Sequence, residues 1–252
     1  MRIARVKQGD RLGFAVIEGD VAAEIDGSPV GDIRFTGQRV PVDQVRLLAP
    51  VLPSKIVCVG RNYADHAAEL GNEMPSEPLL FLKPNTAVIG PGDVIRKPAI
   101  CERLDHEGEL AVVIKGLVRN ADEETAAAAI LGYTCGNDVT ARDLQKADGQ
   151  WTRAKGFDTF CPLGPWIETD VEAIGLDIET RVNGEVRQSG NTKDLTFTPA
   201  FLVSYISKIM TLLPGDVIMT GTPAGVGPMQ PGDRVEVEIG GIGVLSNPVE
   251  AA

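Results

Sequence analysis

Two glutamates in residues 104–116 (LDHEGELAVVIKG) have the spacing of ligands for one cation. Glu107 and Glu109 lie two residues apart, so on an extended chain both side chains leave the same face, with roots roughly 7 Å apart. Two carboxylates beside the apolar run 111–114 are costly unless a cation neutralises them. A hard ion such as Mg²⁺ suits these oxygens. The same alternation also fits the solvated face of an edge strand.

A third acid, Asp138, stands in residues 133–145 (YTCGNDVTARDLQ), after an apolar run. Arg142 and Gln145 follow it by four and seven residues, an order that fits an ion and an anionic ligand held side by side. The position fits equally well the N-cap of a helix that begins at Val139. Spacing leaves both interpretations open.

The chain has two histidines, and one of them has a carboxylate three residues away. If residues 62–71 (NYADHAAELG) are helical, His66 and Glu69 project from the same side. An imidazole oriented by a carboxylate is a common general base, whereas an exposed pair at this spacing is worth only about 0.3 kcal/mol. His106 leaves the opposite strand face from the two glutamates, so we assign it to packing or support of the site.

A loop of Gly, Thr and Pro at residues 219–227 (MTGTPAGVG) can approach a ligand closely and present backbone N–H groups to an anion. It is neither a Walker loop nor a dinucleotide-binding motif, and the rest of the chain has no nucleotide fingerprint.

The elements that must position these residues are mainly strands. Residues 1 to about 50 alternate polar and apolar with regular turns, which predicts a small β-meander. Pro50 and Pro53 mark a junction, so we expect an N-terminal β-domain at 1–53 and a catalytic domain at 54–252. Three Pro-Gly-Asp turns, at 91–93, 214–216 and 231–233, each precede an apolar or alternating run.

Helices are few. Residues 120–133 predict one that begins at Asn120 or Asp122 and stops at Gly132, and residues 198–210 predict another with Thr198 as N-cap. A short turn is predicted from a cap at Asp65 to residue 71. The fold class is therefore α+β and β-dominated.

Composition sets limits on partners and location. The 252 residues carry a net charge of −11 without a basic run, which argues against nucleic acid. No apolar run approaches the ~20 residues of a membrane span, and the start does not read as a signal peptide. The four cysteines are widely separated, which is typical of reduced thiols in a cytoplasmic protein.

Six motifs occur in one order over about residues 54–248: VGRNYADHAAE, FLKP, DHEGELAVVIKG, GYTCGNDVTARDLQ, AKGFDTFCPLGPW and GTPAGVG. This series resembles the fumarylacetoacetate hydrolase family, most closely its bacterial and FAHD-type members that act on short 2-oxo acids. The first fifty residues resemble the small β-domain that often precedes the catalytic domain in bacterial members. The resemblance implies a mixed β-sandwich roll, a homodimer and a divalent ion inside the roll.

The resemblance also implies a role for each matching residue. The ligands of Mg²⁺ or Mn²⁺ would be Glu107, Glu109 and Asp138. The side chains that bind substrate would be Arg142, Gln145 and Thr222. Lys155 would stabilise developing negative charge, and His66 with Glu69 would activate water on a lid that orders when substrate binds.

The expected function is Mg²⁺-dependent cleavage of a C–C bond next to a 2-oxo acid through a metal-stabilised enolate, of the acylpyruvate hydrolase or oxaloacetate decarboxylase type. The substrate would be a small 2-oxo mono- or dicarboxylate. An alternative is a 2-hydroxyhepta-2,4-diene-1,7-dioate isomerase or 5-carboxymethyl-2-oxohex-3-ene-1,7-dioate decarboxylase of aromatic catabolism. An alternative of another class is a metal- and 2-oxo-acid-binding protein with little turnover, which would not need His66 and Glu69.

Overall fold

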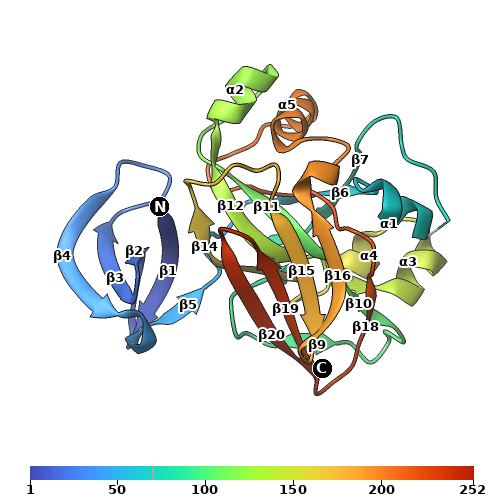
Figure 1. Cartoon of the computed structure of the whole chain (residues 1–252), viewed down its shortest axis with the longest axis horizontal. Coiled ribbons are helices and arrows are strands. Elements are labelled where there is room, and N and C mark those ends of the chain that lie inside the picture. Colours follow the sequence, from blue (N-terminus) through green and yellow to red (C-terminus); the bar gives the residue numbers. More distant parts are fainter. Residues whose placement is uncertain (70) are drawn as a thin grey trace.

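Strands in three sheets dominate the computed structural model, which describes residues 1–69 and 71–252. The five short helices it contains in those residues lie outside the sheets (Figure 1). The β-dominated α+β class and the mixed-sheet roll are thereby confirmed.

The N-terminal residues form an antiparallel meander, as their alternation predicts (left in Figure 1). Its strands are β1 (Arg2–Gln8), β2 (Arg11–Glu18), β3 (Val21–Asp26) and β4 (Arg34–Pro41), followed by the 3₁₀ helix η1 (Val42–Gln44) and β5 (Arg46–Leu48). β1 also pairs with β14 (Cys161–Glu168) of the larger part, which makes one continuous sheet. The domain boundary at residues 53/54 stays a prediction.

The same sheet continues through the centre of the larger part. Its other strands are β6 (Ile56–Gly60), β7 (Leu79–Lys83), β8 (Val88–Ile89), β11 (Gly108–Ile114), β12 (Ile130–Asn137) and β17 (Val217–Met219). β11 lies between β12 and β17, so it is an interior strand and is buried along its whole length.

Two smaller sheets complete the roll. The five-stranded sheet contains β9 (Ile95–Lys97), β15 (Asp177–Val182), β16 (Glu185–Asn191), β19 (Arg234–Ile239) and β20 (Gly243–Ala251). The three-stranded sheet contains β10 (Leu104–His106), β13 (Thr140–Ala141) and β18 (Gly227–Met229).

Alternate residues of β11 connect the central sheet to different layers. Leu110 belongs to a buried apolar cluster with Val237 of β19, whereas Val112 belongs to a cluster with Leu202 and Ile206 of a helix. Residues two apart share a strand face, so this face is covered by the five-stranded sheet at one end and by helices at the other. This packing on one face of β11 fixes the orientation of the strand, and with it the direction in which the Glu109 side chain points.

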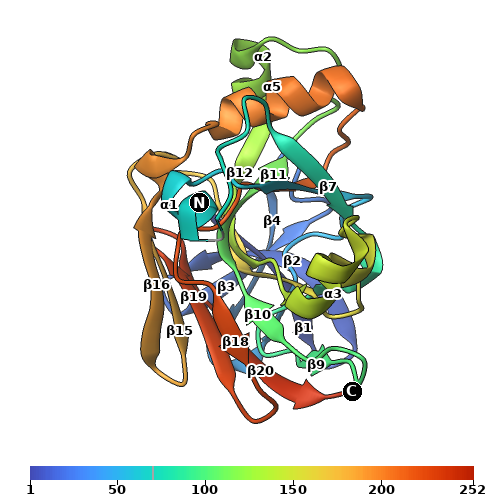
Figure 2. The same cartoon turned by 90° about the vertical axis from the view of Figure 1, so that its right-hand side faces the viewer.

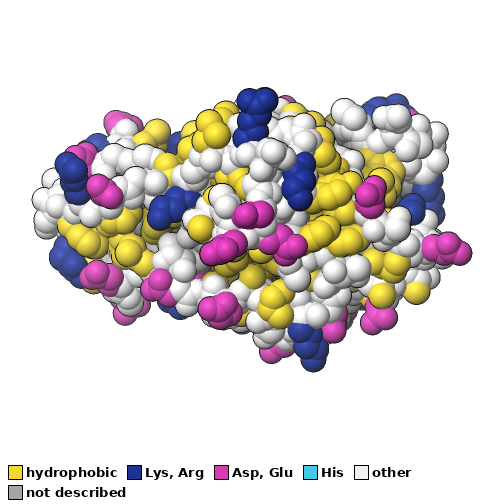
Figure 3. All heavy atoms as spheres, turned by 90° about the horizontal axis from the view of Figure 1, so that it is seen from above, with side chains coloured by type: hydrophobic (Ala, Val, Ile, Leu, Met, Phe, Trp, Pro, Cys, Tyr) yellow, Lys and Arg dark blue, Asp and Glu magenta, His cyan; other side chains and the backbone are white. Residues whose placement is uncertain are grey.

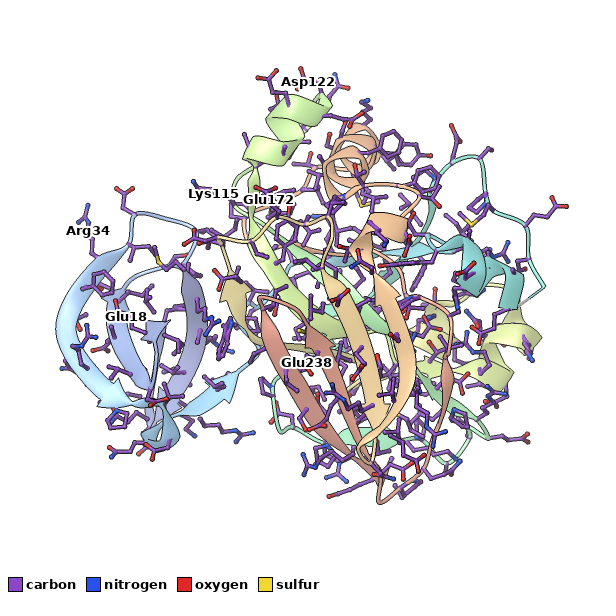
Figure 4. All side chains as sticks on the ribbon, in the orientation of Figure 1. Glu18, Arg34, Lys115, Asp122, Glu172 and Glu238 are labelled. Atoms are coloured by element: carbon purple, nitrogen blue, oxygen red, sulfur yellow. The ribbon has the colours of Figure 1, made fainter. Side chains whose placement is uncertain are left out.

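The helices are α1 (Ala64–Glu69), α2 (Glu123–Ala128), α3 (Arg142–Asp148), α4 (Thr152–Lys155) and α5 (Pro199–Ile209), with 3₁₀ helices η2 (Asn85–Ala87) and η3 (Thr192–Asp194). Thr198 caps α5 as predicted, because its side chain accepts a hydrogen bond from Phe201 N at 3.3 Å. Asp122, at the start of α2 in Figure 4, accepts one from Thr125 N at 2.8 Å.

Two helix boundaries differ from prediction. The helix predicted to stop at Gly132 ends at Ala128, because Ile130 already pairs with Ile114 in the central sheet. Sheet pairing here overrides the helix propensity of an Ala-rich segment. Asp65 is not a cap: α1 begins one residue earlier, and Leu70 lies outside the described residues.

The three Pro-Gly-Asp segments form turns of one kind. Their glycines have φ of +76° (Gly92), +83° (Gly215) and +100° (Gly232), the conformation that glycine tolerates best. In each turn the Asp side chain accepts a hydrogen bond from the backbone N three residues before it, at Gly90, Leu213 and Gln230.

The face that carries α2 and α5 shows Lys and Arg dispersed among Asp and Glu, and neither histidine reaches it (Figure 3). Both histidines are buried. None of the helices in residues 1–69 and 71–252 has the length and apolar character that crossing a membrane requires.

Candidate active site

All nine predicted site residues line one cavity of about 420 Å³. They are His66, Glu69, Glu107, Glu109, Asp138, Arg142, Gln145, Lys155 and Thr222. Four of these residues come from α1 and α3, which lie on the side that faces the viewer in Figure 2. Residues 156 positions apart in sequence are thus brought to one place.

The carboxylates meet where two sheets join. The strand expected through both glutamates is in fact interrupted at Glu107, which links β10 of the small sheet to β11 of the central sheet. Glu107 N donates to Asn137 Oδ1 at 3.0 Å, and Asp138 N donates to Glu107 O at 2.8 Å. These bonds fix the junction to the end of β12, and carboxylate oxygens of Glu107, Glu109 and Asp138 lie within 4.8 Å of one another.

Both alternative interpretations of these acids are wrong. Glu109 is 2% exposed on an interior strand, so it is not on a solvated edge. Asp138 does not cap a helix, since α3 begins at Arg142 with Ala141 as its N-cap.

The residue between the two glutamates, Gly108, lies where the five-stranded sheet approaches the backbone so closely that a side chain has no room. A Cβ at this position would lie 2.1 Å from Thr180 Oγ1 and 3.2 Å from Val237 Cγ1 of the five-stranded sheet. Any side chain would therefore push the two sheets apart. The close approach buries the backbone between the carboxylates and aims both into the cavity.

Two buried cations neutralise Glu107. Lys155 Nζ donates to Glu107 Oε2 at 2.8 Å and to Asp138 Oδ2 at 2.7 Å, and Arg142 donates to Glu107 Oε1. Burial by itself would raise the pKa of Glu107, but Lys155 and Arg142 outweigh it and hold that pKa well below its usual range. Burial likewise lowers the pKa of Lys155, and Asp138 with Glu107 more than reverses this.

Glu109 has the opposite electrostatics. Burial, followed by the nearby charges of Asp138 and Glu107, raises its pKa well above the usual range. Gly221 N donates a hydrogen bond to its Oε2 at 2.7 Å. The cluster is therefore short of positive charge at Glu109.

A divalent cation fits this donor set. Lys83 Nζ lies 2.7 Å from Asp138 Oδ1, but its three protons go to the carbonyl oxygens of Val139, Lys155 and Phe160 at 3.1, 2.6 and 2.8 Å. Asp138 Oδ1 is consequently buried without a hydrogen bond. A buried carboxylate oxygen with an ion-pair partner but no hydrogen bond, a carboxylate short of positive charge and an all-oxygen donor set suit a hard divalent ion.

His66 and Glu69 form a pair at the cavity wall. Their Nδ1 and Oε2 atoms are 3.4 Å apart; His66 is 5% exposed whereas Glu69 is exposed, so only the carboxylate partner fits the interpretation as an exposed surface pair. Gly225 N contacts both oxygens of Glu69, at 3.1 and 3.2 Å. The pair is thereby tied to the loop that also carries Thr222.

Sequence reasoning gave no role to Gln188, which holds this loop from the strand β16. Gln188 Nε2 donates to Thr222 Oγ1 at 2.7 Å and to Pro223 O at 2.8 Å, while its Oε1 accepts from Gly108 N at 2.9 Å. Its Oε1 also lies 3.2 Å from Nδ1 of His106, so Gln188 connects His106 to this loop. The local signal was weak, because β16 lacks a regular alternation of buried and exposed residues.

Lys83 was also missed, although it lies in the FLKP motif. The only local sign of its role is a lysine at the end of an apolar strand. Its partners lie more than fifty residues away in sequence, so the sequence does not reveal them.

Comparison with known proteins agrees with this geometry. Residues 55–250 match the family model described as fumarylacetoacetate (FAA) hydrolase C-terminal. The chain belongs to the fumarylacetoacetate hydrolase family. Residues 1–50 match a second family model, Rv2993c-like, N-terminal.

The relatives and the solved structure that follow cover between 82% and 100% of this chain. Protein Rv2993c of Mycobacterium tuberculosis is 52% identical over 259 residues, 99% of this chain and 98% of that protein. Oxaloacetate tautomerase YisK of Bacillus subtilis is 44% identical over 223 residues, 82% of this chain and 74% of that protein. A solved structure of 5-carboxymethyl-2-hydroxymuconate delta-isomerase from Mycobacterium smegmatis matches with a TM-score of 0.95 and 51% identity over the full length of both chains. The chain is an enzyme of this family.

Proposed function

We propose that this enzyme forms the enolate of a small 2-oxo acid in this cavity, where Glu107, Glu109 and Asp138 would hold a Mg²⁺ or Mn²⁺ ion. The observation that carries the proposal is the convergence of these three buried carboxylates with Lys155 in one cavity. When bound, the ion supplies Lewis-acid polarisation of the 2-oxo group.

Lys155 and Arg142 would bind the charged parts of the substrate. Lys155 stays protonated because its carboxylate partners raise its pKa, so a fixed ammonium faces the charge that develops on the 2-oxo oxygen. Arg142 uses three of its five N–H groups, on Asp105, Glu107 and Gln145. Its two remaining N–H groups are available to the substrate carboxylate.

Gln145 and Thr222 would complete the substrate site. Gln145 Oε1 accepts from Arg142, which leaves its amide N–H groups for substrate oxygen atoms. The Thr222 hydroxyl donates to Gly108 O at 2.8 Å and accepts from Gln188, so Thr222 fixes the loop that borders the substrate.

His66 would move the proton. Glu69 lies at Nδ1 of the imidazole and orients the ring, which leaves Nε2 as the base. Nε2 would take a proton from the carbon next to the 2-oxo group and return it to another atom of the enolate. Net proton transfer of this kind is tautomerisation or double-bond isomerisation.

The names of two similar proteins, a tautomerase and an isomerase, support a proposal of proton transfer as the first candidate, ahead of the C–C cleavage that the motifs favoured. Cleavage remains the second candidate, because the same His66–Glu69 pair can deprotonate a water molecule that attacks a neighbouring carbonyl. Loss of a carboxylate as CO₂ from the carbon next to the 2-oxo group would break a C–C bond without water and would also leave an enolate.

A proton NMR time course tests the proposal. Purified enzyme is mixed in D₂O with oxaloacetate, acetylpyruvate, fumarylpyruvate or a hydroxydienedioate, with Mg²⁺ or with excess chelator. Metal-dependent deuterium exchange or a shifted double bond, faster than without enzyme, supports proton transfer. Pyruvate as a product supports cleavage. Mg²⁺-dependent line broadening without turnover would favour a binding protein, and rates independent of metal would contradict the proposal.

We also propose a homodimer in the cytoplasm. The cytoplasmic assignment rests on four cysteines that are all free and buried. Light scattering tests the assembly, since a dimer has twice the 26.8 kDa of one chain.

A further inference from the structure

One loop contacts both halves of the candidate site. In the loop at residues 220–226, between β17 and β18, Gly221 N donates to Glu109 Oε2 at 2.7 Å. Farther along this loop, Gly225 N donates to Glu69 Oε1 and Oε2 at 3.1 and 3.2 Å. The first bond reaches the carboxylate cluster, and the second reaches the pair of Glu69 with His66. A shift of this loop would therefore move one half of the site relative to the other.

The loop lies against β16, the end strand of the five-stranded sheet. A Cβ on Gly225 would lie 2.2 Å from Arg187 O, and a Cβ on Gly190 would lie 2.7 Å from Pro223 Cβ. At both glycines the loop and the strand thus leave no room for a side chain. Gly225 also has a φ of +98°, a conformation that favours glycine.

Gln188 lies in β16 between these two contacts and is 1% exposed. Its amide nitrogen donates to Thr222 Oγ1 and to Pro223 O, both in the loop. Its amide oxygen accepts from Gly108 N at 2.9 Å and lies 3.2 Å from Nδ1 of His106. A primary amide has two N–H groups and two acceptor lone pairs, so all of its hydrogen-bonding positions are in use. One buried side chain thus joins the loop to the start of β11.

Glu69 depends on this support. Its side chain is 34% exposed, so water competes with His66 for the carboxylate oxygens. Gly225 N is a backbone donor, and it can hold Glu69 in one orientation only if the loop itself is held. The connection therefore runs from Gln188 through the loop to Glu69 and from there to the imidazole of His66.

We propose that Gln188 is a positioning residue for the base: it holds the loop so that Gly225 keeps Glu69 at Nδ1 of His66. Gln188 does not line the cavity, so it acts through the loop and not on the substrate. The role of His66 as the base rests on the proposed function, whereas the state of its ring can be measured without substrate.

Nitrogen NMR of the imidazole rings tests this connection. The chain has two histidines, so the spectrum contains two rings. In ¹⁵N-labelled enzyme with Mg²⁺ at about pH 8.5, well above the ordinary histidine pKa of ~6.5, the shifts show which nitrogen of each neutral ring carries the proton. Both rings of the wild type should carry it on Nδ1, because the acceptor oxygens of Glu69 and Gln188 lie there.

Gln188→Met keeps a similar length but can make none of the hydrogen bonds of the amide. The ring of His106 loses its acceptor directly, so its signal reports that this bond is gone. The ring of His66 should change from the Nδ1–H form to a mixture of both tautomers, because Glu69 is released. The change at His66 is the result that a purely local role of Gln188 would not produce.

Three more variants locate the effect. Gly225→Ala moves the loop and leaves Gln188 in place, so His66 should change while His106 keeps its proton on Nδ1. If either variant does not fold, Thr222→Val breaks the same connection with a side chain of the same shape and should also change His66. Ser189→Ala is the control: it replaces the next residue of β16, which is exposed, and both rings should match the wild type.

The outcomes separate this inference from the proposed function. A wild-type His66 tautomer in Gln188→Met and Gly225→Ala, or an equal change in Ser189→Ala, would overturn the role of Gln188 while the proposed function stands. Turnover in Gln188→Met should fall by up to about 10²-fold, the cost of a small misplacement. If the wild type converts none of the 2-oxo acids, the proposed function fails, and the tautomer of His66 still decides whether Gln188 positions the ring.

Discussion

Lys83→Met removes a buried ammonium that ties together three segments around the cluster of Glu107, Glu109 and Asp138. The side chain of Lys83 is fully buried, and its three protons go to carbonyl oxygens at residues 139, 155 and 160. It also lies 2.7 Å from Asp138 Oδ1. Methionine has a similar length but no proton to donate, so the carbonyl groups and the carboxylate lose their partner together.

The expected cost follows from this geometry. Removing one partner of a buried ion pair costs about 3–5 kcal/mol, because the remaining charge stays buried without compensation. For a chain of 252 residues this lowers the melting temperature by about 6–20 °C. The loss should be large even though Lys155 still binds the other oxygen of Asp138.

Urea unfolding followed by tryptophan fluorescence measures the free energy of unfolding. Arg96→Met is the control, because its ion pair with Glu250 is about half exposed and should contribute less than about 1 kcal/mol. A Lys83→Met variant within about 1 kcal/mol of wild type would refute the reasoning that this ammonium holds the cluster together.

Two further predictions concern individual residues. Asp216 accepts hydrogen bonds from Ser54, Lys55 and Leu213; burial raises its pKa, but these partners outweigh burial and lower it. Asp216→Asn should therefore lower stability by about 1–3 kcal/mol at neutral pH. The stability difference between wild type and variant should shrink as pH falls below the unfolded pKa of ~3.9, because the partners of Asp216 stabilise only its ionised form. A difference in urea unfolding that does not change with pH would contradict this. His66→Ala should keep Mn²⁺ affinity but lower turnover about 10²- to 10⁴-fold, and unchanged turnover would exclude His66 as the base.

The sequence predicted that the three carboxylates lie together because its signals are local. The two-residue spacing of Glu107 and Glu109 is a property of extended chain, and the motif order placed Asp138 with them. Short-range sequence patterns likewise predicted the meander at residues 1–48 and the cap at Thr198.

Features that depend on distant pairing could not be predicted. The interruption at Glu107 arises because β10 and β11 join different sheets, and α2 ends early because Ile130 pairs with β11. Lys83 and Gln188 act through partners far away in sequence, and a single buried polar residue does not name its partner. Three-dimensional contacts alone define those roles.

Manganese titration followed by electron paramagnetic resonance tests the central claim most directly. The account predicts one Mn²⁺ per wild-type chain, much weaker binding and a parallel loss of turnover in Glu109→Gln, and no change in Glu172→Gln, whose side chain is exposed (Figure 4). Wild-type affinity for Mn²⁺ in Glu109→Gln, or full wild-type activity in excess chelator, would contradict it.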